Sequence, residues 1–298
     1  MIEAAAMRGR SRYERVMDGR VDNADGDALT HVVTLADDDA AVEITVASLT
    51  SPTYVIQDAR ARAVAGSVSP DVVAAVPTLA GAAMVAGFTR RAREVTGDGE
   101  GSGLVVDALI EVARLARQVA KLPSERAARA RGGNGRECYE LDMAGWAELP
   151  DSCFTYSEAG RALLATRTVV TPHTPELYSP PPGARGVFRR RKVARLTRTG
   201  DRLHLFHSMH DDVHGFELTY EVDVTTGRIV RADSTTPRLP YPGICSEPQR
   251  RIGSLVGEDF DAGLPKRIQH LIGGAAGCAQ LYDLTSDLLK LAIPRGVS

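Results

Sequence analysis

The sequence matches itself, because residues 26–122 align with residues 200–292 at a nearly constant offset. The offset is 174 at first, slips to 173, and becomes 176 after a proline-containing loop. Matching pairs include Gly26/Gly200, Asp37/Asp211, Glu43/Glu217, Ile56/Ile229, Gly81/Gly257, Arg91/Arg267 and Asp107/Asp283. Because the slips fall in expected turns and loops, we predict two copies of one structural unit.

Both copies change from strand-like to helix-like periodicity in the same order. Residues 216–222 alternate apolar and polar side chains, which is typical of a half-buried strand. Apolar residues at helical spacing follow in each copy: Val105, Leu109, Val112, Ala116 and Val119, and later Leu281, Leu284, Leu288 and Leu291. We therefore predict an α+β fold in which each copy is an antiparallel meander followed by helices. The copies are expected to pack about a pseudo-twofold axis.

The repeat divides the chain into a first, degenerate repeat at residues 1–123, a connector at 124–184 and a second repeat at 185–298. The connector has no counterpart in either copy, and with Trp146 and several tyrosines it is richer in aromatic residues than a bare linker needs. We expect the connector to pack on the two copies and to cover a groove between them.

Charge and composition exclude several classes of partner. With 36 basic and 38 acidic residues, the chain has no electrostatic footprint for nucleic acid or an anionic membrane. It has no apolar run of transmembrane or signal-peptide type, so we expect a cytoplasmic protein. The four widely spaced cysteines indicate reduced thiols. A small molecule is the expected partner, and a homo-oligomer is left open.

Short motifs in the second copy carry a family resemblance. They are Val222-Asp223, Gly227-Arg228-Ile229, Pro242-Gly243-Ile244-Cys245, Leu255-Val256-Gly257 and Gly273-Gly274-Ala275-Ala276-Gly277-Cys278-Ala279-Gln280-Leu281. Together they resemble the uncharacterised bacterial domain-of-unknown-function family 2889, over about residues 185–292 and more faintly in the first copy. The family's closing block usually reads Gly-Cys-Thr-His-Leu, from which Ala279 and Gln280 depart. The resemblance implies a soluble bacterial protein of small-molecule metabolism, which favours an enzyme without assigning its activity.

Reactive side chains distinguish the second copy from the first. His207, His210 and His214 face Val33, Ala36 and Ala40 of the first copy, Cys278 faces Ser102, and His270 faces Glu94. Five of the seven histidines of the chain lie in the second copy. Because shared positions serve the common fold, the residues unique to one copy are free to serve function, and we predict the functional site in the second copy.

The leading hypothesis is a cofactor-independent lyase, isomerase or hydrolase that works by proton transfer. The candidate catalytic residues are His207, His210, Asp211, His214, Glu217 and Cys278. His207 or His210 would act as acid and base while a neighbouring carboxylate orients the imidazole. Cys278 would gain reactivity from the start of a helix, which favours a thiolate. A buried core position for His207, a solvated loop for His210 and His214, and an inert buried thiol are the structural alternatives.

Substrate binding and metal binding give two further predictions. Arg189, Arg191, Tyr156 and His173 are the candidate substrate-binding residues, with the arginines suited to an anionic group. The basic run at 189–192 could instead protect a strand edge. The rival to an enzyme is a non-catalytic or metal-binding accessory protein, with zinc or iron held by His210, His214, Cys245 and Cys278. Their spacing is not an established metal motif, so we expect no cofactor.

Overall fold

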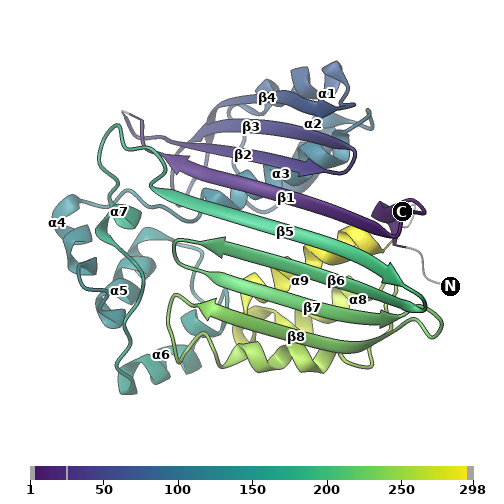
Figure 1. Cartoon of the computed structure of the whole chain (residues 1–298). Coiled ribbons are helices and arrows are strands. Elements are labelled where there is room, and N and C mark those ends of the chain that lie inside the picture. Colours follow the sequence, from purple (N-terminus) through teal and green to yellow (C-terminus); the bar gives the residue numbers. More distant parts are fainter. Residues whose placement is uncertain (1–3, 25, 294–298) are drawn as a thin grey trace.

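The computed structural model describes residues 4–24 and 26–293, which form an eight-stranded antiparallel sheet with helices on one face (Figure 1). The strands are β1 (Arg12–Asp22), β2 (Leu29–Asp37), β3 (Ala40–Ser48), β4 (Ile56–Gly66), β5 (Phe188–Thr199), β6 (Arg202–Asp211), β7 (Gly215–Asp223) and β8 (Arg228–Arg238). Their order is β4-β3-β2-β1-β5-β6-β7-β8. The pairing of β1 with β5 joins two meanders of four strands, which we call the N-terminal and C-terminal halves.

Helices follow each meander along the chain, and a group of short helices lies between them. The α-helices are α1 (Pro70–Ala75), α2 (Phe88–Thr96), α3 (Ser102–Leu115), α4 (Ser124–Ala127), α5 (Gly135–Gly145), α6 (Glu158–Thr166), α7 (Pro175–Tyr178), α8 (Leu264–Ile272) and α9 (Ala279–Ala292). The 3₁₀ turns are η1 (Ala5–Met7), η2 (Val76–Leu79), η3 (Ala128–Ala130), η4 (Phe154–Tyr156), η5 (Pro248–Leu255) and η6 (Gly274–Ala276). Among the described residues, every helix is too short or too polar to cross a membrane.

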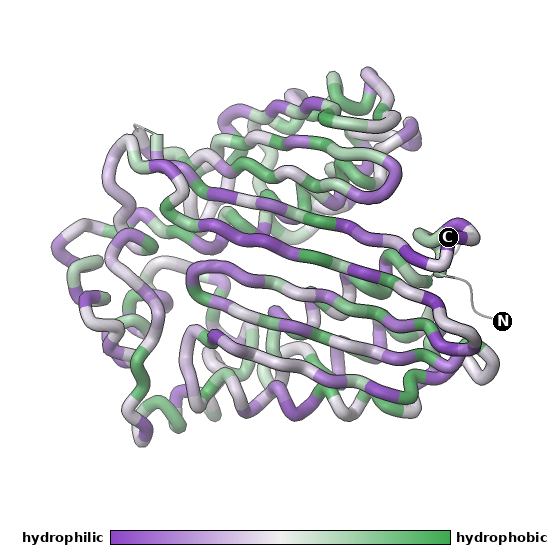
Figure 2. The backbone as a smooth tube through the Cα atoms, viewed as in Figure 1, coloured by the Kyte–Doolittle hydropathy of each residue, from purple (hydrophilic) through white to green (hydrophobic). Residues whose placement is uncertain are grey.

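The strand alternation places one row of side chains under the helices and the other on the open face of the sheet. In β6, Leu203, Leu205 and Met209 are buried, whereas His204 and His210 lie on the opposite face. Figure 2 shows the same alternation as changes of hydropathy along the strands. The predicted strand at 216–222 is confirmed as part of β7. A period of two therefore identified these strands correctly, because only one face of the sheet is covered.

Helices α3 and α9 carry the predicted apolar stripes and pack on the sheet, α3 against β2 and β3 and α9 against β6 and β7. The stripe of the first copy was predicted to continue to Val119, but α3 ends at Leu115. Beyond it, the backbone N–H of Ala120 donates to Leu177 O in α7. Val119 is still buried, but it packs as part of a loop and not as part of the helix.

Two hydrophobic cores lie beneath the sheet, one under each half. The connector contributes to both of them. Leu141 and Trp146 join the core of the N-terminal half, whereas Tyr139 and Leu164 join that of the C-terminal half. The connector is therefore a packed layer at one end of the sheet (Figure 1).

Candidate functional site

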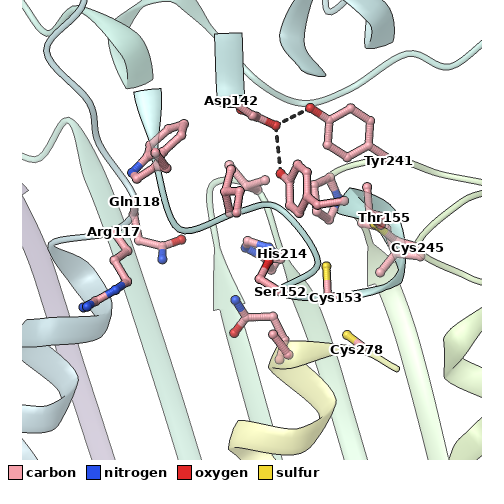
Figure 3. A pocket seen from close by; sticks show the side chains of 18 of the residues that line it. Arg117, Gln118, Asp142, Ser152, Cys153, Thr155, His214, Tyr241, Cys245 and Cys278 are labelled. Carbon is pink, nitrogen blue, oxygen red and sulfur yellow. Dashed lines mark hydrogen bonds between the residues drawn. The ribbon is translucent and has the colours of Figure 1, made fainter. Parts of the chain in front are cut away.

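A pocket of about 160 Å³ lies where the connector meets the C-terminal half (Figure 3). Most of its wall comes from the connector, the β6–β7 turn, the loop after β8 and the start of α9. The lining residues are Arg117, Gln118, Asp142, Trp146, Leu149, Ser152, Cys153, Thr155, Tyr156, His173, Leu177, Val213, His214, Phe216, Leu239, Pro240, Tyr241, Cys245, Pro248, Gly277, Cys278, Ala279 and Gln280. The pocket thus lies mainly under the connector, and the N-terminal half contributes Arg117 and Gln118.

The turn between β6 and β7 presents an imidazole that is held by a carboxylate. Asp211 Oδ1 accepts the backbone N–H groups of Val213 at 2.8 Å and His214 at 2.5 Å, which is the turn chemistry that favours aspartate. Both carboxylate oxygens lie close to His214 Nδ1, at 3.1 and 3.2 Å. The side chain of His214 is 13% exposed, so its ring is mostly covered but still reaches the pocket.

Arg190 completes the environment of this carboxylate. Its Nε and terminal nitrogen lie 2.8 and 2.7 Å from Asp211 Oδ2, and the two side chains are 1% and 0% exposed. Burial raises the pKa of Asp211, but the charges of His214 and Arg190 outweigh it and hold that pKa below its ordinary value. Because an ionised carboxylate only accepts hydrogen bonds, it favours the tautomer with the proton on Nδ1 and leaves Nε2 as a base.

A second buried carboxylate, Asp142 of α5, collects three tyrosine hydroxyl groups. Tyr156 in η4 donates to Asp142 Oδ2 at 2.8 Å, and Tyr178 in α7 donates to Oδ1 at 2.6 Å. Tyr241 after β8 also donates to Oδ2 (Figure 3). Burial and then the charge of Asp142 raise the pKa of all three tyrosines. These hydroxyls therefore stay protonated and tie the connector to the loop after β8.

Two lining residues carry buried polar atoms without a hydrogen-bond partner: Trp146 at Nε1 and His173 at Nδ1. The His173 ring stacks on Tyr178 with a centroid distance of 6.0 Å and an interplanar angle of 27°. Burial lowers the pKa of His173, so its imidazole is neutral at pH 7. Unpaired buried polar groups are uncommon in folded proteins.

Three of the four cysteines, all free thiols, line the same pocket (Figure 3). Cys278 is the N-cap of α9, as predicted, yet burial raises its pKa to about 11. Burial of Cys278 therefore favours the neutral thiol, which is the inert alternative that the sequence left open. Burial also raises the pKa of Cys153 and Cys245. Within residues 4–24 and 26–293, no three His, Cys, Asp or Glu side chains form a group that could hold a metal ion.

His207 lies outside this pocket, in a buried charge network between the two halves. Its Nδ1 is 2.9 Å from Leu284 O, and burial lowers its pKa to about 4. Lys192 Nζ, close by, lies 2.8 Å from Glu111 and 3.2 Å from Asp287. The adjoining cavity of about 40 Å³ has room for little more than a water molecule, so His207 occupies the core position that the sequence left as its alternative.

The predicted residues on the open face of the sheet are also separate from the pocket. Arg189, Arg191 and His210 line a shallow groove of that face. Arg191 pairs with Asp18, and His210 lies 3.4 Å from Glu217, with half-exposed side chains in both pairs. His210 thus has a carboxylate beside it, but in water such pairs contribute little. The arginines and His210 do not join the other predicted site residues, because alternation turns them away from the helices.

The structure therefore brings together five of the predicted residues: Asp211, His214, Cys278, Tyr156 and His173. Sequence reasoning missed Asp142 and Tyr241, whose partners lie in distant segments. The aromatic content of the connector and the reactive side chains unique to the second copy were the sequence signals that pointed to this pocket.

Comparison with known proteins gives one match. No curated protein and no solved structure matches the chain. A family model matches residues 195–293, which run from β5 to the end of α9 and include the Asp211–His214 turn. This stretch of the chain is thus similar to the family described as protein of unknown function (DUF2889).

Proposed function

We propose that this protein is a cofactor-independent enzyme that transfers protons on a small molecule, as a lyase, isomerase or hydrolase. The observation that carries the proposal is the Asp211–His214 pair at the wall of a pocket. A carboxylate that orients an imidazole is the minimal general-base unit. Nε2 takes a proton from the substrate, or from a water molecule that attacks it, and returns that proton later in the cycle.

The neighbouring charges suit this role. Arg190 keeps Asp211 ionised, and the ionised carboxylate stabilises the imidazolium that forms when Nε2 takes the proton. Ser152 also lines the pocket and could hold a water molecule or a substrate oxygen.

We also propose that the two halves arose by duplication and that only the C-terminal copy is catalytic. The corresponding turn of the N-terminal half has the same framework: Asp37 accepts the N–H groups of Asp39 and Ala40 and pairs with Arg15 at 3.1 Å. Ala40 stands where the C-terminal half has His214. The shared aspartate therefore serves the turn, and the histidine adds the chemistry.

Irregularities in the strands support the same duplication. Strand β3 shifts register against β4 after Ala41 and again after Ala47. Strand β7 shifts against β8 after Gly215 and after Glu221, which are the positions paired with Ala41 and Ala47 at an offset of 174. Register shifts of this kind tend to persist within families, so their coincidence favours a common origin.

Exchange of substrate C–H protons with solvent deuterium tests the catalytic proposal. Small uncharged carbonyl compounds are incubated with the protein in D₂O, and loss of the proton signal next to the carbonyl is followed by NMR. Removal of a general base costs about 10²- to 10⁴-fold in rate, so His214→Gln should exchange at least about 100-fold more slowly than the wild type.

His204→Gln is the matched control, because His204 lies on the open face, 3.9 Å from Glu221. Its rate should equal that of the wild type. The proposal fails if His214→Gln keeps the wild-type rate on a compound that the wild type exchanges, or if His204→Gln loses the rate equally.

A further inference from the structure

We infer that the pocket binds an uncharged molecule with one six-membered ring and one oxygen substituent, a hydroxyl or a carbonyl. This inference rests on the proposed function for its choice of site, and it adds the class of substrate. Three features of the pocket lead to this class of ligand: its size, the charges around it and the unpaired polar groups among its lining residues.

The volume of the pocket limits the ligand to about one ring. An engineered cavity of about 150 Å³ binds benzene, and this pocket measures about 160 Å³. Pockets for drug-sized ligands are larger, at about 300 to 1,000 Å³. The pocket itself therefore has room for about one ring, and a larger ligand would have to extend out of it.

The charges around the pocket favour a neutral ligand. In the described part of the chain, Arg117 is the one lysine or arginine in the wall, and its guanidinium is already engaged. It lies 4.6 Å from the centre of the Tyr54 ring and 3.5 Å from Glu148, and it donates to two backbone carbonyls at 2.6 Å. An anion would find no unengaged cation in this wall, and it would face the carboxylate of Asp142. A cation would compete with the hydrogen bonds that this carboxylate already accepts.

Aromatic side chains make the wall suited to a ring. Aromatic residues are only 5% of the chain, yet Trp146, Tyr156, Phe216 and Tyr241 all line this pocket, together with the His173 imidazole. Rings of this kind attract another ring by stacked or edge-to-face contacts. The leucines and prolines of the wall complete an apolar surface around it.

The unpaired polar atoms call for one oxygen on that ring. Trp146 Nε1 is a donor without an acceptor, so it fits an oxygen lone pair. His173 Nδ1 lacks a partner, and His214 Nε2 is left as an acceptor by the tautomer that Asp211 favours. A hydroxyl group can accept from the indole and donate to an imidazole, whereas a hydrocarbon can do neither.

Binding of three matched probes tests the inference: benzyl alcohol, benzoate and benzylammonium have the same ring and differ in charge. Trp146 is the only tryptophan of the chain, so its fluorescence reports occupancy of this pocket. Benzyl alcohol should change the emission saturably, with a dissociation constant at least tenfold lower than that of either charged probe. Equal or tighter binding of benzoate or benzylammonium overturns the inference, as does the absence of binding by benzyl alcohol.

Trp146→Phe keeps a ring but removes the N–H donor. Loss of one hydrogen bond should weaken benzyl alcohol binding about 2- to 10-fold by calorimetry. Unchanged affinity in a folded Trp146→Phe variant contradicts the assigned donor. His214→Gln separates this inference from the proposed function: proton exchange should fall at least about 100-fold, whereas benzyl alcohol binding should weaken only about 2- to 10-fold, as expected for the loss of one hydrogen bond. If the protein exchanges protons of charged substrates only, the catalytic proposal stands and the inferred class of ligand is refuted.

Discussion

Replacement of Asp211 by asparagine tests the buried turn on which the site depends. Asparagine keeps an oxygen that can accept the N–H groups of Val213 and His214, so the main loss is the negative charge. Arg190, whose side chain is 1% exposed, is then left with Gln118 as a neutral acceptor at 2.9 Å. Breaking a buried ion pair in this way costs about 3 to 5 kcal/mol of unfolding free energy.

Asp37→Asn in the N-terminal half is the matched control. Its partner Arg15 also pairs with Asp107 at 2.7 Å, and the two side chains of the Arg15–Asp37 pair are 17% and 10% exposed. Because Arg15 keeps a carboxylate and some contact with water, we expect a smaller loss of about 1 to 2 kcal/mol. Urea unfolding at pH 7 measures both costs.

The pH dependence of this difference has a defined sign. The folded-state pKa of Asp211 lies below its unfolded value of about 3.9, so the stabilisation is present above that pH and is lost as pH falls toward the folded pKa. The gap between the wild type and Asp211→Asn should therefore still be present at pH 5 and should shrink below about pH 4. Equal costs for the two variants, or a cost below about 1 kcal/mol for Asp211→Asn, would refute this reasoning.

Three further predictions concern other buried groups. Burial lowers the pKa of His31 to about 4, so the unfolded state takes up this proton at a higher pH than the folded state does. The free energy of unfolding therefore falls as pH drops from about 6.5 to 4. His31→Gln should reduce that slope by about 1.4 kcal/mol per pH unit in urea titrations. Tyr178→Phe leaves Asp142 Oδ1 without its donor and should cost about 1 to 3 kcal/mol in thermal unfolding. With its pKa raised to about 11, Cys278 should react with iodoacetamide at pH 8 about 100-fold more slowly in the folded than in the urea-unfolded protein, as followed by mass spectrometry.

The sequence could predict the elements whose signal is local. Alternation at 216–222 identified β7, and the spacing of Leu281, Leu284 and Leu288 identified α9, because each element buries one face against the other. The sequence also indicated His214 and Asp211 as site residues, since these lie three residues apart in one turn. Local spacing is enough for such features.

The rest depends on contacts between distant segments. Asp142 is linked to Tyr241, and neither residue belongs to a periodic pattern that would predict the partner. The sequence did not decide whether His207 or His210 would act as acid and base. Strand alternation shows which residues share a face of the sheet, but it does not show which face the pocket adjoins. Cys278 was placed correctly at a helix start, yet its raised pKa depends on burial by the connector, which the sequence does not specify.

The tautomer of His214 tests the central claim most directly. In protein labelled with ¹⁵N-histidine, the His214 signals are assigned by their absence in His214→Gln and recorded at pH 8 with and without benzyl alcohol. We expect the Nδ1 that faces Asp211 to carry a proton, and we expect the Nε2 signal to shift when the ligand binds. A proton on Nε2, with no response to the ligand, would contradict the claim.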